Sequence, residues 1–232
     1  MLTSLNSGMP VLTADAFVSN TERTVCITGH RDKKISPYNR DPNYSRITVD
    51  AVRFMLYRYI DMAIECGYTD FFSGLAPGTD LWAAEYILKK RENNKNIRLI
   101  AAMPYLRHAE NFSRSDLDLL EQTEIKADVL LTVNPDPDIT YSRRISSKTS
   151  PALYRDRNYF MVDNSSAVIA FLSKCAAISG TAQTVNYARR RGRIVRDFGI
   201  EDIYSLIDCA GDDFKKIGES VRNIDNVFKM FR

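Results

Sequence analysis

The chain reads Ser73-Gly74-Leu75-Ala76-Pro77-Gly78-Thr79-Asp80 between an apolar run at 69–72 and a run of helical character at 81–91. A strand that ends in a glycine-rich turn and continues as a helix leaves backbone N–H groups without partners at the start of the helix. These N–H groups and the helix dipole favour anions, above all phosphate. Thr79 or Asp80 could instead cap the helix. The stretch therefore predicts a strand–turn–helix unit that either binds phosphate or is simply capped.

Strands and helices alternate along the rest of the chain. Apolar runs predict strands at 24–28, 69–72, 97–102, 128–133, 166–172 and 193–197, and helical spacing predicts helices at 47–66, 79–91, 114–126, 152–163 and 180–191. This alternation is typical of an α/β, Rossmann-like, doubly wound and mostly parallel sheet in a single domain. We expect that domain at 24–200, an N-terminal extension at 1–23, and a helical or ragged extension at 201–232. Ligands bind such sheets at the carboxyl ends of the strands, where the winding reverses.

The amino-acid composition disfavours several classes of function. A formal net charge of +3 over 232 residues is too small to indicate a nucleic-acid-binding protein by itself. Two histidines rule out a His-rich metal site, and the four cysteines lack metal-ligand spacing, so we expect no metal, no cofactor and mostly buried, reduced thiols. No apolar run approaches the roughly 18–20 residues of a membrane helix. The first twenty residues lack a basic segment, so we expect a cytoplasmic protein.

Polar residues follow the strand predicted at 24–28. Gly29, His30 and Arg31 come directly after it, where they would face the ligand crevice. The Arg31 guanidinium could hold a phosphate through two hydrogen bonds. A solvated loop, whose histidine bonds a backbone carbonyl, explains the same residues equally well.

Further candidates lie on the predicted helix at 79–91 and after the strand at 97–102. Asp80 is close enough to the helix start to reach a ribose hydroxyl, whereas Glu85 lies one turn further in and is more typical of a structural or solvated position. Trp82 and Tyr105, the latter preceded by Pro104, could stack on a base, although a core position is the favoured interpretation for Trp82.

A second glycine turn follows the strand at 166–172. Gly180 frees the backbone, and Thr181 offers a hydroxyl at the start of the next helix. Two such turns in one sheet favour a ligand the size of a nucleotide. Asn158 would lie at a helix edge near the crevice, but a surface helix carrying arginines such as Arg157 is the favoured interpretation of its surroundings.

The strand ending in Thr28-Gly29-His30-Arg31, the turn at 73–80 with Trp82-Ala83-Ala84-Glu85, and the segment 179–188 together resemble the YpsA-like branch of the SLOG superfamily. That superfamily joins the Smf/DprA DNA-processing proteins with the Lonely Guy phosphoribohydrolases. The resemblance covers roughly residues 24 to 197. It implies a Rossmann-like domain that binds a nucleotide or nucleotide-derived molecule at its glycine turns.

The activity stays open among three hypotheses. Lonely Guy enzymes cleave an N-glycosidic bond beside a Pro-Gly-Gly-x-Gly-Thr-x-x-Glu turn, but the matching turn here lacks Pro-Gly-Gly and has Thr184 at the position expected for the glutamate. The leading hypothesis is therefore a sensor or sequestering module for a nucleotide-derived signal, with phosphates on the backbone of 74–79 and 180–181. The alternatives are a nucleotide N-glycosidase using Asp80 or Glu85, and a single-stranded DNA binder. A homo-oligomer is expected, with the helix at 47–66 as a candidate face.

Overall fold

The computed structural model describes residues 2–35, 41–136, 138–139, 150–173, 179–210, 213, 215–216 and 218–219. The strands are β1 (Leu2–Thr3), β2 (Pro10–Thr13), β3 (Thr24–Gly29), β4 (Asp70–Ser73), β5 (Arg98–Met103), β6 (Val129–Thr132), β7 (Ala167–Leu172) and β8 (Ile194–Gly199). The α-helices are α1 (Asp32–Ile35), α2 (Pro42–Glu65), α3 (Thr79–Asn93), α4 (Arg114–Lys126), α6 (Ser150–Asp163), α7 (Gly180–Arg190) and α8 (Ile200–Ala210).

The strands form one sheet in the order β1-β2-β6-β5-β4-β3-β7-β8. Only the β1–β2 pair is antiparallel, so the prediction of a Rossmann-like, mostly parallel α/β fold is confirmed. From β3 the chain winds outward through β4 and β5 to β6, and then returns to the other side of β3 with β7 and β8. The winding therefore reverses between β3 and β7.

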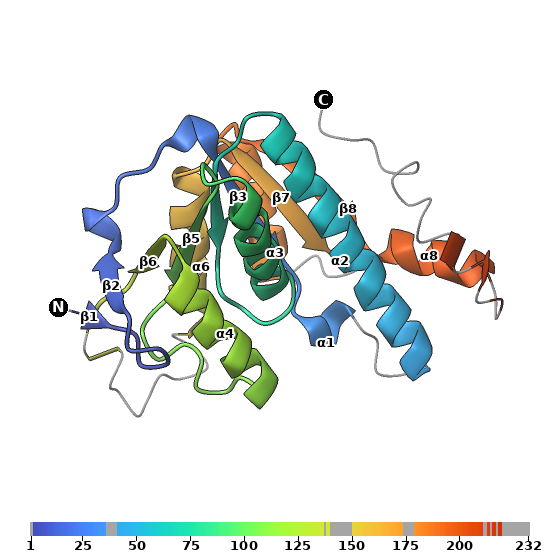
Figure 1. The fold of residues 1–232 in the computed structure, drawn as a ribbon, viewed down its shortest axis with the longest axis horizontal. Coiled ribbons are helices and arrows are strands. Elements are labelled where there is room, and N and C mark those ends of the chain that lie inside the picture. The colour runs from blue at the N-terminus through green and yellow to red at the C-terminus, as the bar shows by residue number, and fades with distance from the viewer. Residues whose placement is uncertain are drawn as a thin grey trace.

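Helices cover both faces of the sheet (Figure 1). The helices α2, α3, α4 and α8 pack on one face, and α6 and α7 pack on the other. Successive side chains of β3 alternate between the two cores, because neighbouring residues of a strand point to opposite faces. Val25 and Ile27 enter the core beneath α2, whereas Cys26 enters the core beneath α6 and α7.

Local capping sets the helix boundaries. The Asp41 carboxylate accepts the N–H of Asn43 at 2.6 Å, and Pro42 occupies the first turn of α2, where a missing N–H costs nothing. The helix therefore begins at Pro42, five residues before the start predicted at Ile47. The bounds predicted for α4 were correct, since the Ser113 hydroxyl caps that helix.

The N-terminal segment contains structure that the sequence did not indicate. Residues 2–13, expected within an extension, supply β1 and β2, and Leu12 pairs with Leu131 of β6. Val11 is buried in the core beside α3 and α4. The helix α8 occupies 200–210, in the region expected to be helical or ragged, and most of residues 134–151 lie outside the described residues.

The cysteine prediction was wrong in one respect, because Cys66 and Cys209 are exposed and Cys26 is buried. Cys175 lies outside the described residues. Within the part of the chain that the structure describes, no helix has the length and apolar character needed to cross a membrane.

Candidate functional site

A cavity of about 370 Å³ lies where the winding of the sheet reverses, at the carboxyl ends of β3 and β7. This is the place where open α/β sheets bind their ligands. The turns after β3, β4 and β7 and the helix α6 form its walls. Its lining consists of Thr28, Gly29, His30, Arg31, Lys34, Ala76, Asp80, Tyr154, Arg157, Asn158, Ser179, Gly180 and Thr181.

Gly29 allows the start of α3 to pack directly against the end of β3. A Cβ atom at Gly29 would lie 2.4–2.5 Å from three side-chain atoms of Thr79. The Thr79 hydroxyl donates a hydrogen bond to the His30 carbonyl at 3.0 Å, which fixes the two elements to each other. A larger residue at position 29 would therefore push the start of α3 away from the end of β3.

His30 connects β3, β7 and α7. Its backbone N–H donates to the Phe171 carbonyl at 3.0 Å, and its Nδ1 lies 3.4 Å from the Thr181 hydroxyl. The side chain is buried, and its Nε2 has no hydrogen-bond partner among the residues that the structure describes. Burial, together with the positive charge of Lys34, lowers the pKa of His30, so the imidazole is neutral at pH 7. An uncharged polar atom is thus available to a ligand.

Internal hydrogen bonds hold the turn at 73–80 in place. The Ser73 hydroxyl donates to the Asp80 carbonyl at 2.8 Å and accepts the N–H of Leu75 at 3.2 Å. Leu75 is buried with a φ of 59°, a left-handed conformation that is uncommon for a residue other than glycine. Gly78, with a φ of 87°, occupies the N-cap of α3, where no side chain accepts a hydrogen bond, so neither Thr79 nor Asp80 caps the helix.

A buried ion pair forms the floor of the cavity. Arg157 of α6 is 3% exposed, and its Nη1 donates to the Gly74 carbonyl and lies 3.7 Å from Oδ2 of Asp80. Burial raises the pKa of Asp80 to about 6, although the charge of Arg157 acts in the opposite direction. Oδ1 of Asp80 has no hydrogen-bond partner in the described part of the chain. The prediction of a surface helix was therefore wrong for Arg157.

The N-terminus of α7 forms the opposite wall. The Ser179 hydroxyl accepts the N–H of Ala182 at 3.0 Å, which is the usual capping bond. Gly180 and Thr181, the first two residues of α7, also line the cavity, and the first N–H groups of a helix have no acceptor within the helix itself. Asn158 donates to the Thr184 hydroxyl at 2.9 Å and so ties α6 to α7.

Half of the residues predicted to bind a ligand line this cavity: Gly29, His30, Arg31, Asp80, Asn158, Gly180 and Thr181. Others support the turn from behind without lining it: Ser73, Gly74, Leu75, Gly78 and Thr79. The carbonyl of Pro104 accepts two hydrogen bonds from Asn134, and Tyr105 is buried with its ring edge-on to that of Tyr154.

Two aromatic or acidic candidates lie away from the cavity. Glu85 is on the exposed side of α3, where it pairs with Arg53 at 3.2 Å. Trp82 packs against the core beneath α2, with the Arg53 guanidinium 5.8 Å from the centre of its ring system.

Six residues of the lining were not among the predicted ligand-binding residues: Thr28, Lys34, Ala76, Tyr154, Arg157 and Ser179. Lys34 is exposed at the cavity, and Tyr154 has the guanidinium carbons of Arg31 and Arg157 each 5.7 Å from its ring centre. The periodicity of 152–163 predicted the helix α6 but gave no sign of which side meets the sheet edge.

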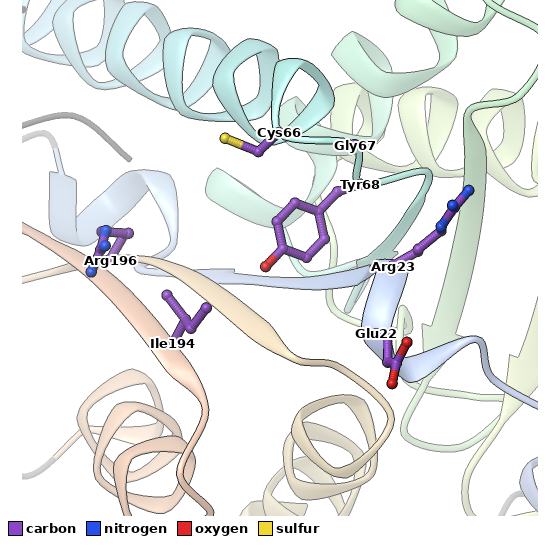
Figure 2. Close-up of a pocket in the computed structure, with 7 residues that line it drawn as sticks. All are labelled: Glu22, Arg23, Cys66, Gly67, Tyr68, Ile194 and Arg196. Atoms are coloured by element: carbon purple, nitrogen blue, oxygen red, sulfur yellow. The ribbon is translucent and has the colours of Figure 1, made fainter. Parts of the chain in front are cut away.

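A second hollow, of about 510 Å³, lies at the amino ends of the parallel strands, opposite the first cavity, and is shown in Figure 2. Its residues are Glu22, Arg23, Cys66, Gly67, Tyr68, Ile194 and Arg196. They precede β3, follow α2 or lie at the start of β8, and the Tyr68 ring points toward Ile194 (Figure 2). Because these are the amino ends of parallel strands, α2 presents its C-terminal end to this hollow, through Cys66 and Gly67.

The model of the YpsA family, described as the YspA SLOG family, matches residues 25–190, from β3 to the end of α7. A curated relative, the uncharacterized SPbeta prophage-derived protein YoqJ of Bacillus subtilis (strain 168), is 28% identical over 123 residues. That alignment covers 52% of this chain and 69% of YoqJ. The family match spans the three glycine-bearing turns that surround the cavity. The chain therefore belongs to the YpsA family of SLOG proteins.

Proposed function

We propose that the cavity between β3 and β7 binds a nucleotide or nucleotide-derived signalling molecule, as a sensor or sequestering module. The observation that carries this proposal is the pairing of an anion-suited helix N-terminus with a buried carboxyl whose Oδ1 lacks a partner among the described residues. Membership of the YpsA family of SLOG proteins, which points to nucleotide-related binding or processing, supports the same class of ligand.

The phosphate end of the ligand is assigned to α7. The N–H groups of Gly180 and Thr181 and the dipole of an 11-residue helix favour a negative charge there. Arg31 and Lys34 line the same cavity and are exposed, so their positive charges are free to approach a phosphate without breaking buried contacts. Two cations and a helix N-terminus together favour a phosphate over a neutral ligand.

The sugar or base end of the ligand is assigned to Asp80 and His30. Both side chains are buried, and each has a polar atom without a partner among the described residues. A ligand hydroxyl or amino group that donates to Asp80 Oδ1 would remove the cost of leaving that acceptor unpaired. A cavity of about 370 Å³ is at the lower end of the range of small-molecule sites, which favours a ligand of mononucleotide size.

The second candidate function is cleavage of an N-glycosidic bond, and Asp80 favours it. A buried carboxyl with its pKa raised to about 6 can hold a proton near neutral pH, as a general acid must. Glu85 lies outside the cavity, so in this reading Asp80 is the acid and Arg157 keeps it in position.

Binding of single-stranded DNA receives less support from the basic run at 189–193. Arg189 pairs with Asp197 at 2.9 Å, and Arg191 pairs with Asp163 at 2.7 Å. These ion pairs reduce the positive charge that the run could offer to a DNA backbone.

The test is a calorimetric and thermal-shift screen against nucleoside monophosphates, nucleoside diphosphates, cyclic nucleotides and ADP-ribose, with mass spectrometry of each ligand after incubation. A ligand recovered intact supports the sensor, and release of free base supports the glycosidase. Arg31→Ala should weaken binding by about 10-fold, because it removes a charge-assisted contact. The matched control is Arg23→Ala, because Arg23 is also exposed but lies at the amino ends of the strands (Figure 2). Equal affinity of the two variants, or binding of oligonucleotides alone, would contradict the proposal.

A further inference from the structure

A separate cavity of about 250 Å³ lies between the β1–β2 turn, the β5–α4 connection and α4. It shares no lining residue with the cavity between β3 and β7, called the nucleotide cavity below. Leu5, Leu106 and Leu117 give it apolar walls, and Asn6, His108 and Glu124 give it polar ones. An apolar pocket with a few convergent polar groups is the usual form of a small-molecule site.

Glu124 is a buried carboxyl without a counter-ion. It is 1% exposed, and its Oε2 accepts the Ser4 hydroxyl at 2.6 Å. Its Oε1 has no hydrogen-bond partner, and no cationic side chain pairs with it, among the residues that the structure describes. Burial raises the pKa of Glu124, with hydrogen bonds from Ser4, Ser7 and Asn6 acting in the opposite direction. A nearby positive charge would offset this cost of desolvation.

His108 adds a second acceptor to the same cavity. Its Nδ1 lies 3.1 Å from the Tyr105 carbonyl, and a carbonyl only accepts, so Nδ1 carries the ring proton. Burial, helped by the charge of Arg157, lowers the pKa of His108 to about 3, which keeps the ring neutral. The lone pair on Nε2 has no partner in the described part of the chain, although the side chain is only 5% exposed.

The charges around the cavity indicate which charge and which hydrogen-bonding groups a ligand would need. Arg107 is paired with Glu110 at the rim, which leaves the Glu124 carboxylate as the uncompensated charge of the lining. Both unpartnered atoms, Glu124 Oε1 and His108 Nε2, accept hydrogen bonds, so a ligand has to bring donors and a positive charge. A metal ion fits poorly, because the described residues contain no group of three His, Cys, Asp or Glu side chains that could hold one.

We propose that this cavity binds a small organic ammonium ion, with Glu124 as its counter-ion, His108 as a further acceptor, and its hydrocarbon part against Leu106 and Leu117. The site is independent of the nucleotide cavity, so it stands whether or not a nucleotide binds. Its size admits a short alkyl amine and excludes a large polyamine in an extended form.

The test is an NMR titration of the full chain, in an amine-free buffer, with n-butylammonium, n-butanol and butyrate. We expect n-butylammonium to shift the amide signals of Asn6 and Ala109 with a Kd of the order of millimolar, since a ligand of five heavy atoms gains limited free energy. Butanol should bind at least about 10-fold more weakly and butyrate not at all, because neither brings a positive charge to Glu124.

Glu124→Gln keeps the shape and an acceptor for Ser4 while removing the charge, and it should weaken n-butylammonium binding by about 10-fold or more. The matched control is Glu121→Gln, an exposed carboxylate on the same helix, which should change Kd by less than about 2-fold. Equal binding of n-butylammonium and butanol to the unchanged chain would overturn the proposal even if Glu124→Gln failed to fold. No shift up to about 100 mM, or undiminished binding by a folded Glu124→Gln variant, would also overturn it.

Discussion

Replacing Gly29 by alanine tests how closely the end of β3 packs against α3. The new Cβ would lie 2.4–2.5 Å from Oγ1, Cβ and Cγ2 of Thr79, about 1 Å inside an ordinary contact. The Thr79 Cβ belongs to the rigid part of its side chain, so rotation alone cannot relieve the overlap and the start of α3 has to move. That movement also strains the hydrogen bond from Thr79 to the His30 carbonyl.

The expected cost follows from these two effects. Overpacking in a close-packed region costs about 1–3 kcal/mol, and a weakened buried hydrogen bond adds about 1 kcal/mol. We therefore expect Gly29→Ala to lower the free energy of unfolding by about 2–4 kcal/mol. Urea unfolding followed by fluorescence of Trp82, the single tryptophan, measures the loss directly.

Gly180→Ala is the matched control, because a Cβ there meets nothing within 4 Å and the backbone is not left-handed. It should leave stability unchanged or raise it by up to about 1 kcal/mol. The double variant Gly29→Ala/Thr79→Gly removes the clashing atoms and should recover part of the loss. If Gly29→Ala were as stable as Gly180→Ala, the close approach of α3 to β3 would be refuted.

Three further predictions concern the ion pairs. The pKa of Asp80 is about 6 in the folded chain against 3.8 for a free side chain, so the folded chain holds this proton more tightly and the free energy of unfolding falls by about 3 kcal/mol as the pH rises from about 4 to 6. Urea unfolding across that pH range should show a smaller fall for Asp80→Asn, and parallel curves for the two proteins would contradict the prediction. Arg157→Lys keeps the positive charge but lacks the planar set of guanidinium donors at the Gly74 carbonyl, so the free energy of unfolding should fall by about 2–3 kcal/mol. Calorimetric unfolding measures this change, and an unchanged Tm would refute the contact. Glu85→Gln breaks only an exposed ion pair with Arg53, so the free energy of unfolding should change by less than about 1 kcal/mol and nucleotide affinity should be retained. A loss of affinity in titration calorimetry would show that Glu85 acts at the site.

The parallel core was predictable because each of its strands is a short apolar run between turn residues. The helix α4 was placed to the residue, since Ser113 and the apolar spacing after it mark a helix start that needs no tertiary contact. The start of α2 was missed although Asp41 and Pro42 form a regular start signal, because the apolar spacing used to place the helix begins only at Ile47.

The candidate site was predictable where the backbone itself creates it. Gly29 and Gly180 follow strands, and the carboxyl ends of neighbouring strands meet at one edge. Arg157 was not predictable, because its burial depends on which face of α6 meets the turn at 73–80, and one sequence contains no measure of that contact. Glu85 is five residues from Asp80 on the same helix, and that spacing turns its side chain to the exposed face.

The pairing of β2 with β6 has a consequence for how the chain is made. Leu12 and Thr13 of β2 are synthesised before the central strands, yet their partners Leu131 and Thr132 follow 119 residues later. Until then β2 can pair only with β1 and lacks the parallel neighbour that joins it to the rest of the sheet. Residues 2–13 are thus synthesised before the central strands and join the sheet after them, and during that interval their apolar side chains are available to chaperones.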